Sequence, residues 1–257
     1  MSLTRHPLPH LETLVSCIGL GTVKWGRNQQ VKYPAFELPT DATLHALLDL
    51  AEAAGLNLLD TAPAYGIAEE RVGQILQQRG GSAFVVMTKT GETFIDGESS
   101  YDFTAQATRS SVMRSLKRLN RDHLDLVMVH CSADDVSVLR DTPVLETLER
   151  LRHEGLLRSI GVSTMTVEGG LLATDLVDAV MVPFNIGYQA HLPVIEKAQL
   201  VGKGVLLKRA LYSGPAQGSA LTPQEMLGPL LATAGVTSII VGTINPEHLR
   251  DNLEAGM

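Results

Sequence analysis

Cysteines, clustered positive charge and long apolar runs are all scarce in this 257-residue chain. The two cysteines, Cys17 and Cys131, lie far apart and have no neighbours at metal-ligand spacing. They predict small buried side chains in a reducing compartment, although the sequence leaves a disulfide open. No Lys/Arg cluster offers a nucleic-acid face, and the net charge of −7 mainly favours solubility. No run approaches the roughly 18 apolar residues of a membrane span, and the N-terminus has no apolar signal core. We therefore expect a cytoplasmic protein that binds neither nucleic acid nor a membrane.

The remaining composition is that of a well-packed globular protein. Hydrophobic residues make up 44% of the chain and aromatic residues only 4%, without any low-complexity tract. No linker divides the sequence, so we expect one domain over residues 1–257. Short runs rich in Val, Ile, Leu and Met alternate with longer amphipathic stretches such as 41–55 and 104–120. The runs cover residues 17–23, 56–60, 84–89, 124–130, 157–163, 177–182, 204–208 and 237–242.

This alternation predicts the fold. Runs that are apolar throughout indicate strands buried on both faces, as in parallel sheets covered by helices. Eight such strands alternating with helices over about 250 residues are typical of an eight-stranded parallel (β/α)8 barrel, or TIM barrel. An open doubly wound sheet is the alternative arrangement.

Six of the runs end in a polar or charged residue or in glycine. In a parallel barrel these ends all open on the face where barrel enzymes place their sites. One polar residue would mark only the end of a strand, but Asp, Lys and His on three consecutive strand ends favour a site. The Asp and the Lys can also satisfy one another at low dielectric. The six residues are Asp60, Lys89, His130, Ser163, Lys208 and Gly242.

Segments along nearly the whole chain resemble the aldo-keto reductase family. The order Asp, then Tyr five residues later, then Lys and His at the following strand ends is a specific combination. The resemblance implies a nicotinamide-dependent barrel, usually preferring NADPH, that reduces small aldehydes and ketones to alcohols or runs the reverse. The segments are "GLGTVKWG" (19–26), "LLDTAPAYG" (58–66), "VMTKTG" (86–91), "LDLVMVH" (124–130), "IGVS" (160–163) and "NPEHLRDNLEA" (245–255).

The chemistry explains why four residue types are needed. Hydride arriving at a carbonyl carbon leaves negative charge on the oxygen, which a proton must neutralise. Tyr65 can supply that proton, and a nearby Lys89 ammonium would lower the tyrosine pKa from about 10 while Asp60 holds the lysine. The resemblance implies that His130 donates a hydrogen bond to the substrate carbonyl. We therefore predict these four as catalytic residues, with Tyr65 and His130 also contacting the substrate.

The end of the first strand predicts the first cofactor contacts. "GLGTVKWG" lacks the third glycine spacing of a dinucleotide fingerprint, and no helix follows it directly. The resemblance instead aligns Gly21, Thr22 and Val23 along the cofactor. Trp25 either walls the substrate pocket or packs in the core, and the sequence favours neither.

Three sites depart from the family pattern around the nicotinamide. Ser163 and Thr164 replace the usual Ser-Asn pair. Met181 stands where Gln is common, and Lys208 stands where an aromatic ring often stacks. A lysine there adds a cation that would alter the electronics of the ring. Besides Asp60, the other cofactor contacts implied by the resemblance are Arg209, Leu211, Ser213, Gly242, Thr243, His248, Asp251 and Asn252.

The choice between NADPH and NADH rests on the last helix. Gly242 and His248 stand where the family often has a Lys and an Arg for the 2′-phosphate. Thr243 and Asn252 are retained, however, and the N-terminus of a helix favours an anion. We therefore favour NADPH over NADH.

The chain resembles a short form of the family. It stops at Met257, directly after the last barrel helix, whereas many members carry a longer C-terminal loop over the substrate pocket. We expect a more open pocket beside two mobile loops, 91–103 and 212–222. The expected assembly is a monomer or a weak homo-oligomer.

Two other classes of function fit the sequence. The altered nicotinamide contacts would suit a cofactor-binding regulatory or redox-sensing protein with little turnover, although the intact four-residue set favours an enzyme. A barrel hydrolase or lyase using Asp60 and Lys89 would require that no nucleotide binds. We expect no metal site, because the eight histidines show no ligand spacing such as H-E-x-x-H.

Overall fold

The barrel strands of the structure match the eight apolar runs. The structure, a computed structural model, describes residues 2–31, 34–80, 84–211 and 221–257. Within these residues, eight parallel strands close into a barrel in the order β10-β11-β12-β3-β4-β5-β8-β9. The predicted (β/α)8 barrel is confirmed, and the open doubly wound sheet is wrong. The strands are β3 (Ile18–Gly21), β4 (Leu58–Asp60), β5 (Val85–Thr90), β8 (Leu124–His130), β9 (Leu157–Ser163), β10 (Ala179–Pro183), β11 (Gly204–Lys208) and β12 (Ser238–Val241).

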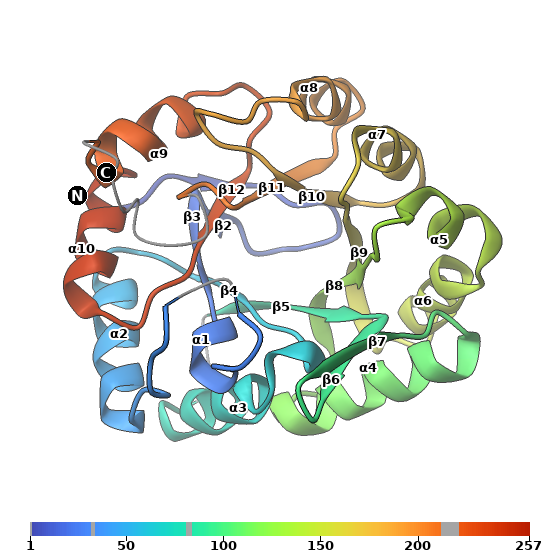
Figure 1. The fold of residues 1–257 in the computed structure, drawn as a ribbon, viewed down its shortest axis with the longest axis horizontal. Helices are drawn as coiled ribbons and strands as arrows, with labels where there is room; N and C mark the ends of the chain where they lie inside the picture. Colours follow the sequence, from blue (N-terminus) through green and yellow to red (C-terminus); the bar gives the residue numbers. More distant parts are fainter. Residues whose placement is uncertain (1, 32–33, 81–83, 212–220) are drawn as a thin grey trace.

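Helices surround the strands on the outside of the barrel (Figure 1). Thr40 caps α2, because its hydroxyl accepts a hydrogen bond from the backbone N–H of Thr43. Asn120, in the left-handed conformation (φ 53°), ends α4. None of the described helices is long and apolar enough to cross a membrane. The helices are α1 (Val23–Gly26), α2 (Asp41–Ala53), the 3-10 helix η1 (Pro63–Tyr65), α3 (Ala68–Gln78), α4 (Ala105–Leu119), α5 (Asp135–Asp141), α6 (Val144–His153), α7 (Val167–Leu176), α8 (Leu192–Leu200), α9 (Pro223–Leu231) and α10 (Pro246–Glu254).

The hydrophobic core has two parts. The larger part lies between the strands and the surrounding helices and includes the buried helix residues Leu44, Val72 and Leu148. The smaller part fills the barrel itself, because side chains alternate along a strand and every second one points inward. The interior part consists of Leu8, Val15, Leu58, Val85, Met87, Leu126, Met128, Ala179, Met181 and Leu206.

A short N-terminal hairpin closes one end of the barrel. Strands β1 (Arg5–His6) and β2 (Val15–Ser16) pair antiparallel, and the sequence did not predict them. Their hairpin inserts Leu8 and Val15 into the interior cluster, where both are buried. Leu8 packs against Gly204 at the start of β11, where an added Cβ would lie 2.0 Å from its Cδ2. The interior is therefore sealed at the N-terminal ends of the strands, away from the predicted site.

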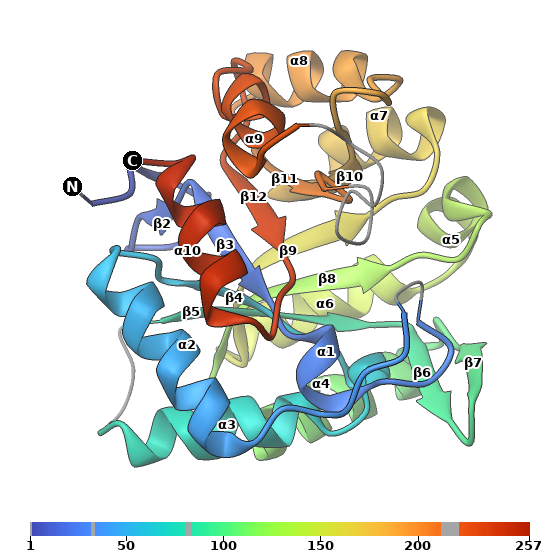
Figure 2. The same ribbon diagram turned by 60° about the vertical axis from the view of Figure 1, so that its left-hand side comes forward.

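A second hairpin follows β5 at the opposite end of the barrel. Strands β6 (Glu92–Ile95) and β7 (Glu98–Tyr101) pair antiparallel around Asp96 and Gly97, whose φ angles are 52° and 87°. Positive φ at both positions is the pattern of a two-residue type I′ turn. The prediction of a loop over 91–103 is therefore wrong, and residues 212–220 of the other predicted loop lie outside the described residues. Figure 2 shows the hairpin beyond the end of β5, on the same side of the barrel as α1.

Candidate active site

The candidate residues lie at the C-terminal ends of the barrel strands, at positions whose side chains face the inside of the barrel. Because inward positions recur every second residue, the residue two places beyond an interior side chain also faces inward. The strands end at this point, so the next inward position opens on the mouth. In this way Asp60 follows Leu58, Lys89 follows Met87, His130 follows Met128, and Lys208 follows Leu206.

Asp60 and Lys89 form a buried ion pair across neighbouring strands. Lys89 Nζ donates to Asp60 Oδ1 and, at 3.0 Å, to the backbone carbonyl of Thr61. Lys89 and Asp60 are only 2% and 5% exposed. Burial works against the charge of the lysine, but Asp60 and Tyr65 together outweigh it and raise the pKa of Lys89 above its ordinary value. The lysine is therefore a fixed positive charge at the mouth of the barrel.

Tyr65 is delivered to the same place by η1, which follows β4. Its ring lies 4.7 Å, centroid to Nζ, from Lys89 and makes an edge contact with His130 at 6.3 Å between centroids. Burial and the charge of Asp60 raise the pKa of Tyr65 to about 12, and Lys89 lowers it only in part. The predicted net lowering by the lysine is wrong for the protein without ligands, because desolvation of the phenolate outweighs the attraction of the cation.

His130 has an acidic partner that the sequence did not predict. Its Nδ1 lies 2.8 Å from Oε2 of Glu92, on the β6–β7 hairpin. The other oxygen of Glu92 accepts a hydrogen bond of 2.7 Å from the hydroxyl of Ser99. Burial lowers the pKa of His130, and the nearby Lys89 and Lys208 lower it further, while Glu92 raises it. His130 therefore sits between one buried acid and two cations.

Lys208 reaches across the end of β10 to β9. Its Nζ donates to the hydroxyl of Ser163 at 2.9 Å and lies 3.8 Å from the sulfur of Met165. No described carboxylate lies within ion-pair distance of this ammonium. Burial, Arg209 and Lys89 together lower the pKa of Lys208 to about 7. Lys208 is thus a cation that loses its proton near neutral pH.

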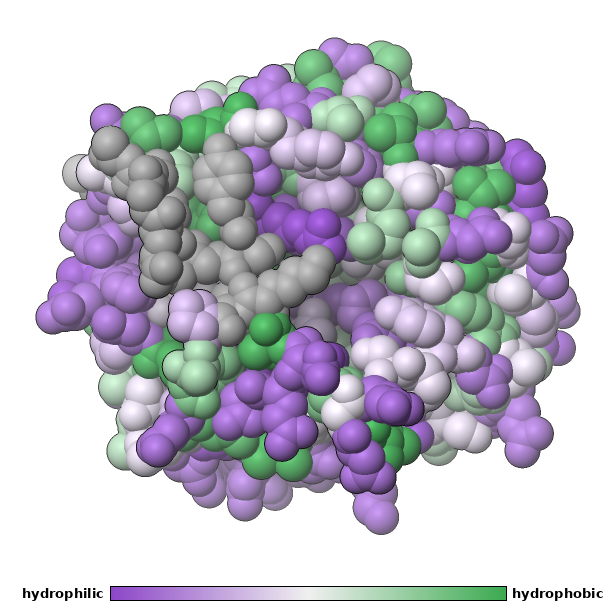
Figure 3. Space-filling view, viewed as in Figure 1, coloured by the Kyte–Doolittle hydropathy of each residue, from purple (hydrophilic) through white to green (hydrophobic). Residues whose placement is uncertain are grey.

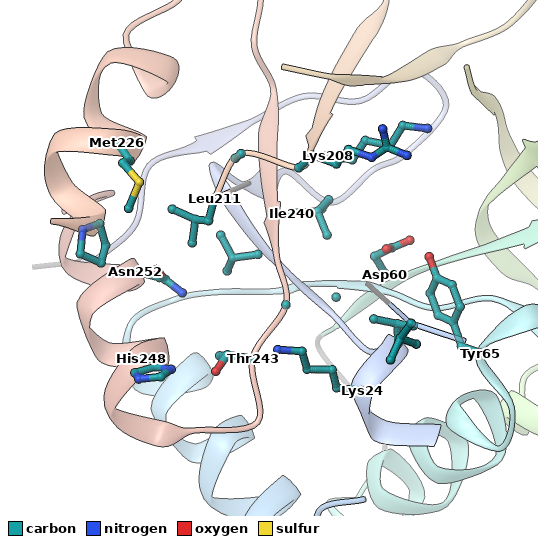
Figure 4. A pocket seen from close by; sticks show the side chains of 18 of the residues that line it. Lys24, Asp60, Tyr65, Lys208, Leu211, Met226, Ile240, Thr243, His248 and Asn252 are labelled. Atoms are coloured by element: carbon teal, nitrogen blue, oxygen red, sulfur yellow. The ribbon is translucent and has the colours of Figure 1, made fainter. Parts of the chain in front are cut away.

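A cavity of about 530 Å³ opens beside these residues. Figure 4 shows Asp60 and Tyr65 at one end of it and Thr243, His248 and Asn252 at the other. Figure 3, viewed down the barrel, shows hydrophilic residues beside a hollow near the centre of this face. The predicted residues that line the cavity are Gly21, Val23, Asp60, Tyr65, Lys208, Arg209, Leu211, Gly242, Thr243, His248, Asp251 and Asn252.

Several predicted contacts lie elsewhere. Trp25 is completely buried in the outer core, as its packing alternative requires, and Met181 lies in the barrel interior. Both are core residues and do not line the cavity. Thr22 uses its hydroxyl to donate to the backbone carbonyl of Asp60 at 3.0 Å. Ser213 falls outside the described residues.

Comparison with known proteins agrees with this geometry. The profile of the Aldo/keto reductase family matches residues 17–193, which is more than half of the chain. The chain belongs to the aldo/keto reductase family.

Similar proteins extend the match over almost the full length of this aldo-keto reductase. A candidate aldo-keto reductase of Pseudomonas aeruginosa with a crystal structure is 43% identical, with a TM-score of 0.87 over 98% of this chain and 93% of that one. The uncharacterised oxidoreductase YqkF of Bacillus subtilis (strain 168) is 27% identical over 82% of this chain and 81% of its own length. D-threo-aldose 1-dehydrogenase of a Pseudomonas species is 31% identical over 51% of this chain and 46% of its own length. Membership of the family makes this protein an oxidoreductase for carbonyl substrates.

Three residues at the mouth of this aldo-keto reductase were missed from the sequence. Lys24 and Arg27, on and just after α1, line the cavity. Glu92 approaches His130 only because the β6–β7 hairpin folds back over the barrel. The Asp96-Gly97 pair between two short polar segments was the one signal for this hairpin, since Asp-Gly is a preferred type I′ turn.

Proposed function

We propose that this aldo-keto reductase reduces aldehydes or ketones to alcohols with NADPH, and that the same groups serve the reverse oxidation. The observation that carries the proposal is the buried Asp60–Lys89 pair beside Tyr65 and His130, at the end of a cavity large enough for a ligand. A bound nicotinamide supplies hydride to the carbonyl carbon. The side chains at the mouth are proposed to orient the carbonyl, donate the proton and stabilise the charge that remains.

Tyr65 is the proposed general acid. A pKa of about 12 keeps its hydroxyl protonated, so the proton stays in place until negative charge develops on the carbonyl oxygen. Lys89 then stabilises the phenolate that remains, and Asp60 keeps the lysine ammonium in position. His130 is proposed to orient the carbonyl oxygen through a hydrogen bond.

The residues present also suit a nicotinamide dinucleotide. The buried Thr164 Oγ1 has no hydrogen-bond partner among the described residues, and it follows Ser163, so this pair is proposed to bind the carboxamide. At the far end of the cavity, the first turn of α10 and Thr243 offer donors to an anion. The remaining proposed contacts are the predicted residues that line the cavity.

Lys24 supports the choice of NADPH. The family's usual cations are absent from the last helix, but Figure 4 shows the Lys24 side chain extending toward Thr243. Both residues line the same cavity, and His248 lies on its opposite wall. A 2′-phosphate carries roughly two negative charges, so a nearby ammonium favours NADPH over NADH.

Replacing this lysine tests the preference. We expect Lys24→Met to weaken NADPH binding about tenfold and to leave NADH binding within a factor of two, because only NADPH has the 2′-phosphate. Fluorescence titration with each cofactor measures the two dissociation constants, for NADPH and for NADH. His248→Gln, on the opposite wall of the cavity, is titrated in the same way for comparison. An equal loss for both cofactors would place Lys24 on the pyrophosphate and remove this basis for NADPH.

Turnover is tested by the loss of NADPH absorbance with a panel of aldehydes and ketones, and by the gain of absorbance with NADP+ and a panel of aldoses. Aldoses are included because one relative is named as an aldose dehydrogenase. Consumption of NADPH supports the reductase. Tight NADPH binding without consumption by any compound would favour the regulatory or redox-sensing alternative instead.

We also propose that the chain is one domain acting in the cytoplasm as a monomer or a weak homo-oligomer. A single closed barrel, with one part of the core inside it and the other between its strands and helices, supports the first point. Analytical ultracentrifugation over a range of concentrations would test the assembly, and a stable dimer at low concentration would overturn this part of the proposal.

A further inference from the structure

Glu92 is a buried acid held firmly against His130. Glu92 as a whole is 8% exposed, with Oε2 2.8 Å from His130 Nδ1 and Oε1 accepting a hydrogen bond from the Ser99 hydroxyl. Both oxygens are therefore engaged. The pKa of Glu92 lies below its ordinary value, because His130, Ser99 and the charge of Arg27 together outweigh its burial. Glu92 thus faces His130 as a carboxylate.

The hairpin that carries Glu92 is fixed in place by further contacts, one of them made by Arg27 at the mouth. The guanidinium of Arg27 lies 3.4 Å from the ring centroid of Phe94 on β6. The backbone N–H of Asp102 donates to the carbonyl of Gly91 at 2.9 Å, which closes the base of the hairpin. Arg27 in turn donates to the carbonyl of Ala64, next to Tyr65. The position of Glu92 is therefore tied to the loop that carries the proposed acid.

This contact decides which ring nitrogen of His130 holds a proton. A carboxylate oxygen offers only lone pairs, which would repel the lone pair of an unprotonated Nδ1 at 2.8 Å, so Nδ1 must carry a hydrogen. A neutral imidazole has only one N–H, which leaves Nε2 with a lone pair that cannot donate to a carbonyl oxygen. The Nδ1 atom is buried and forms no hydrogen bond of regular geometry, so its 2.8 Å contact with Glu92 is an ion pair. The His130 side chain as a whole is 21% exposed, so the exposed part belongs to the rest of the ring. To donate toward the mouth, His130 must therefore carry two protons.

We infer that Glu92 is a positioning residue that stabilises the doubly protonated form of His130, and that this imidazolium is the form that binds the carbonyl oxygen. The inference rests on the proposed function of the site. The charged or titratable groups near the ring are Glu92, Tyr65, Lys89 and Lys208, and of these only Glu92 favours the extra proton. Turnover then requires protonated His130 and declines as pH rises through the His130 pKa.

The test is Glu92→Gln, which keeps the shape of the side chain and removes its charge. We expect the pH at which kcat/KM for carbonyl reduction falls to half to move about one unit lower, and kcat/KM at pH 7 to fall about tenfold. Glu98 lies on the same hairpin and is exposed, so Glu98→Gln is the matched control and should behave as wild type. Glu92→Asp, which keeps the charge, should restore most of the profile if the hairpin remains folded.

A second readout separates this inference from the proposed function. Titration of the His130 ring by NMR in the protein without cofactor, assigned with His130→Gln, measures its protonation directly. A lower midpoint in Glu92→Gln together with the shifted kcat/KM profile supports the inference. An unchanged midpoint overturns it, and so does a lowered midpoint with a wild-type pH profile. If no carbonyl is reduced at any pH, the proposed function fails while the ring titration still decides whether Glu92 stabilises the imidazolium.

Discussion

Tyr65→Phe should lower kcat/KM for carbonyl reduction by about 10³-fold or more, while the Kd for NADPH stays within a factor of two. The substitution removes only the hydroxyl, and the ring can keep its contacts with Lys89 and His130. Without the hydroxyl, the ring beside Lys89 has no proton to give to the developing alkoxide. Steady-state kinetics and a fluorescence titration with NADPH measure the two quantities on one preparation.

The control for this variant is Tyr188→Phe, because Tyr188 is a tyrosine with 45% of its surface exposed. It should leave both quantities unchanged. Turnover in Tyr65→Phe at more than a tenth of the wild-type rate would remove Tyr65 from the acid role. His130 would then be the next candidate donor, since its ring contacts Tyr65 and it is backed by Glu92.

Lys208→Met should stabilise the protein against urea by roughly 2 kcal/mol at pH 6 and much less near pH 10. The folded protein lowers the pKa of Lys208 from 10.5 to about 7, so folding works against its charge. Below pH 7 the ammonium is charged in both states and the full cost is present. Between pH 7 and 10.5 the unfolded chain binds more protons, so the wild-type stability rises with pH and the advantage of methionine shrinks.

Lys117→Met is the control for this pH dependence. Lys117 is an exposed lysine on α4, so its replacement should change the stability by little at either pH. Urea unfolding of the three proteins at pH 6 and pH 10 gives the free energies directly. A gain for Lys208→Met that is equal at both pH values would mean that methionine merely packs better, and that the charge of Lys208 costs nothing.

The sequence determined the barrel because its signal is repeated. Each of the eight apolar runs overlaps an observed strand, with β5 and β10 extending one residue beyond their runs. The two-residue alternation places Asp60, Lys89 and His130 on one inner surface. The contact between Asp60 and Lys89 followed from this register alone, since β4 and β5 are neighbours in the barrel. Positions that depend only on strand order and periodicity are therefore accessible from the sequence.

Contacts made by segments without a repeated hydrophobic pattern could not be predicted from the sequence in the same way. Glu92 lies at the start of a four-residue strand whose side chains are mostly polar, so it has no hydrophobic pattern to reveal it. Trp25 could not be placed either, because a large aromatic residue suits both a pocket wall and a core. The direction of the pKa shift of Tyr65 was predicted wrongly for a related reason. The sequence shows the lysine that lowers this pKa, but it does not show the degree of burial, which raises the pKa more.

The N-terminal hairpin has a consequence for how the chain folds as it is synthesised. Leu8 leaves the ribosome nearly two hundred residues before Gly204, against which it packs. The inner core therefore cannot be completed until β11 has emerged, and until then a partial barrel has an unfilled lower end. This long-range contact gives the hairpin a high contact order. Closure of the barrel interior is thus a late event that joins segments far apart in the sequence.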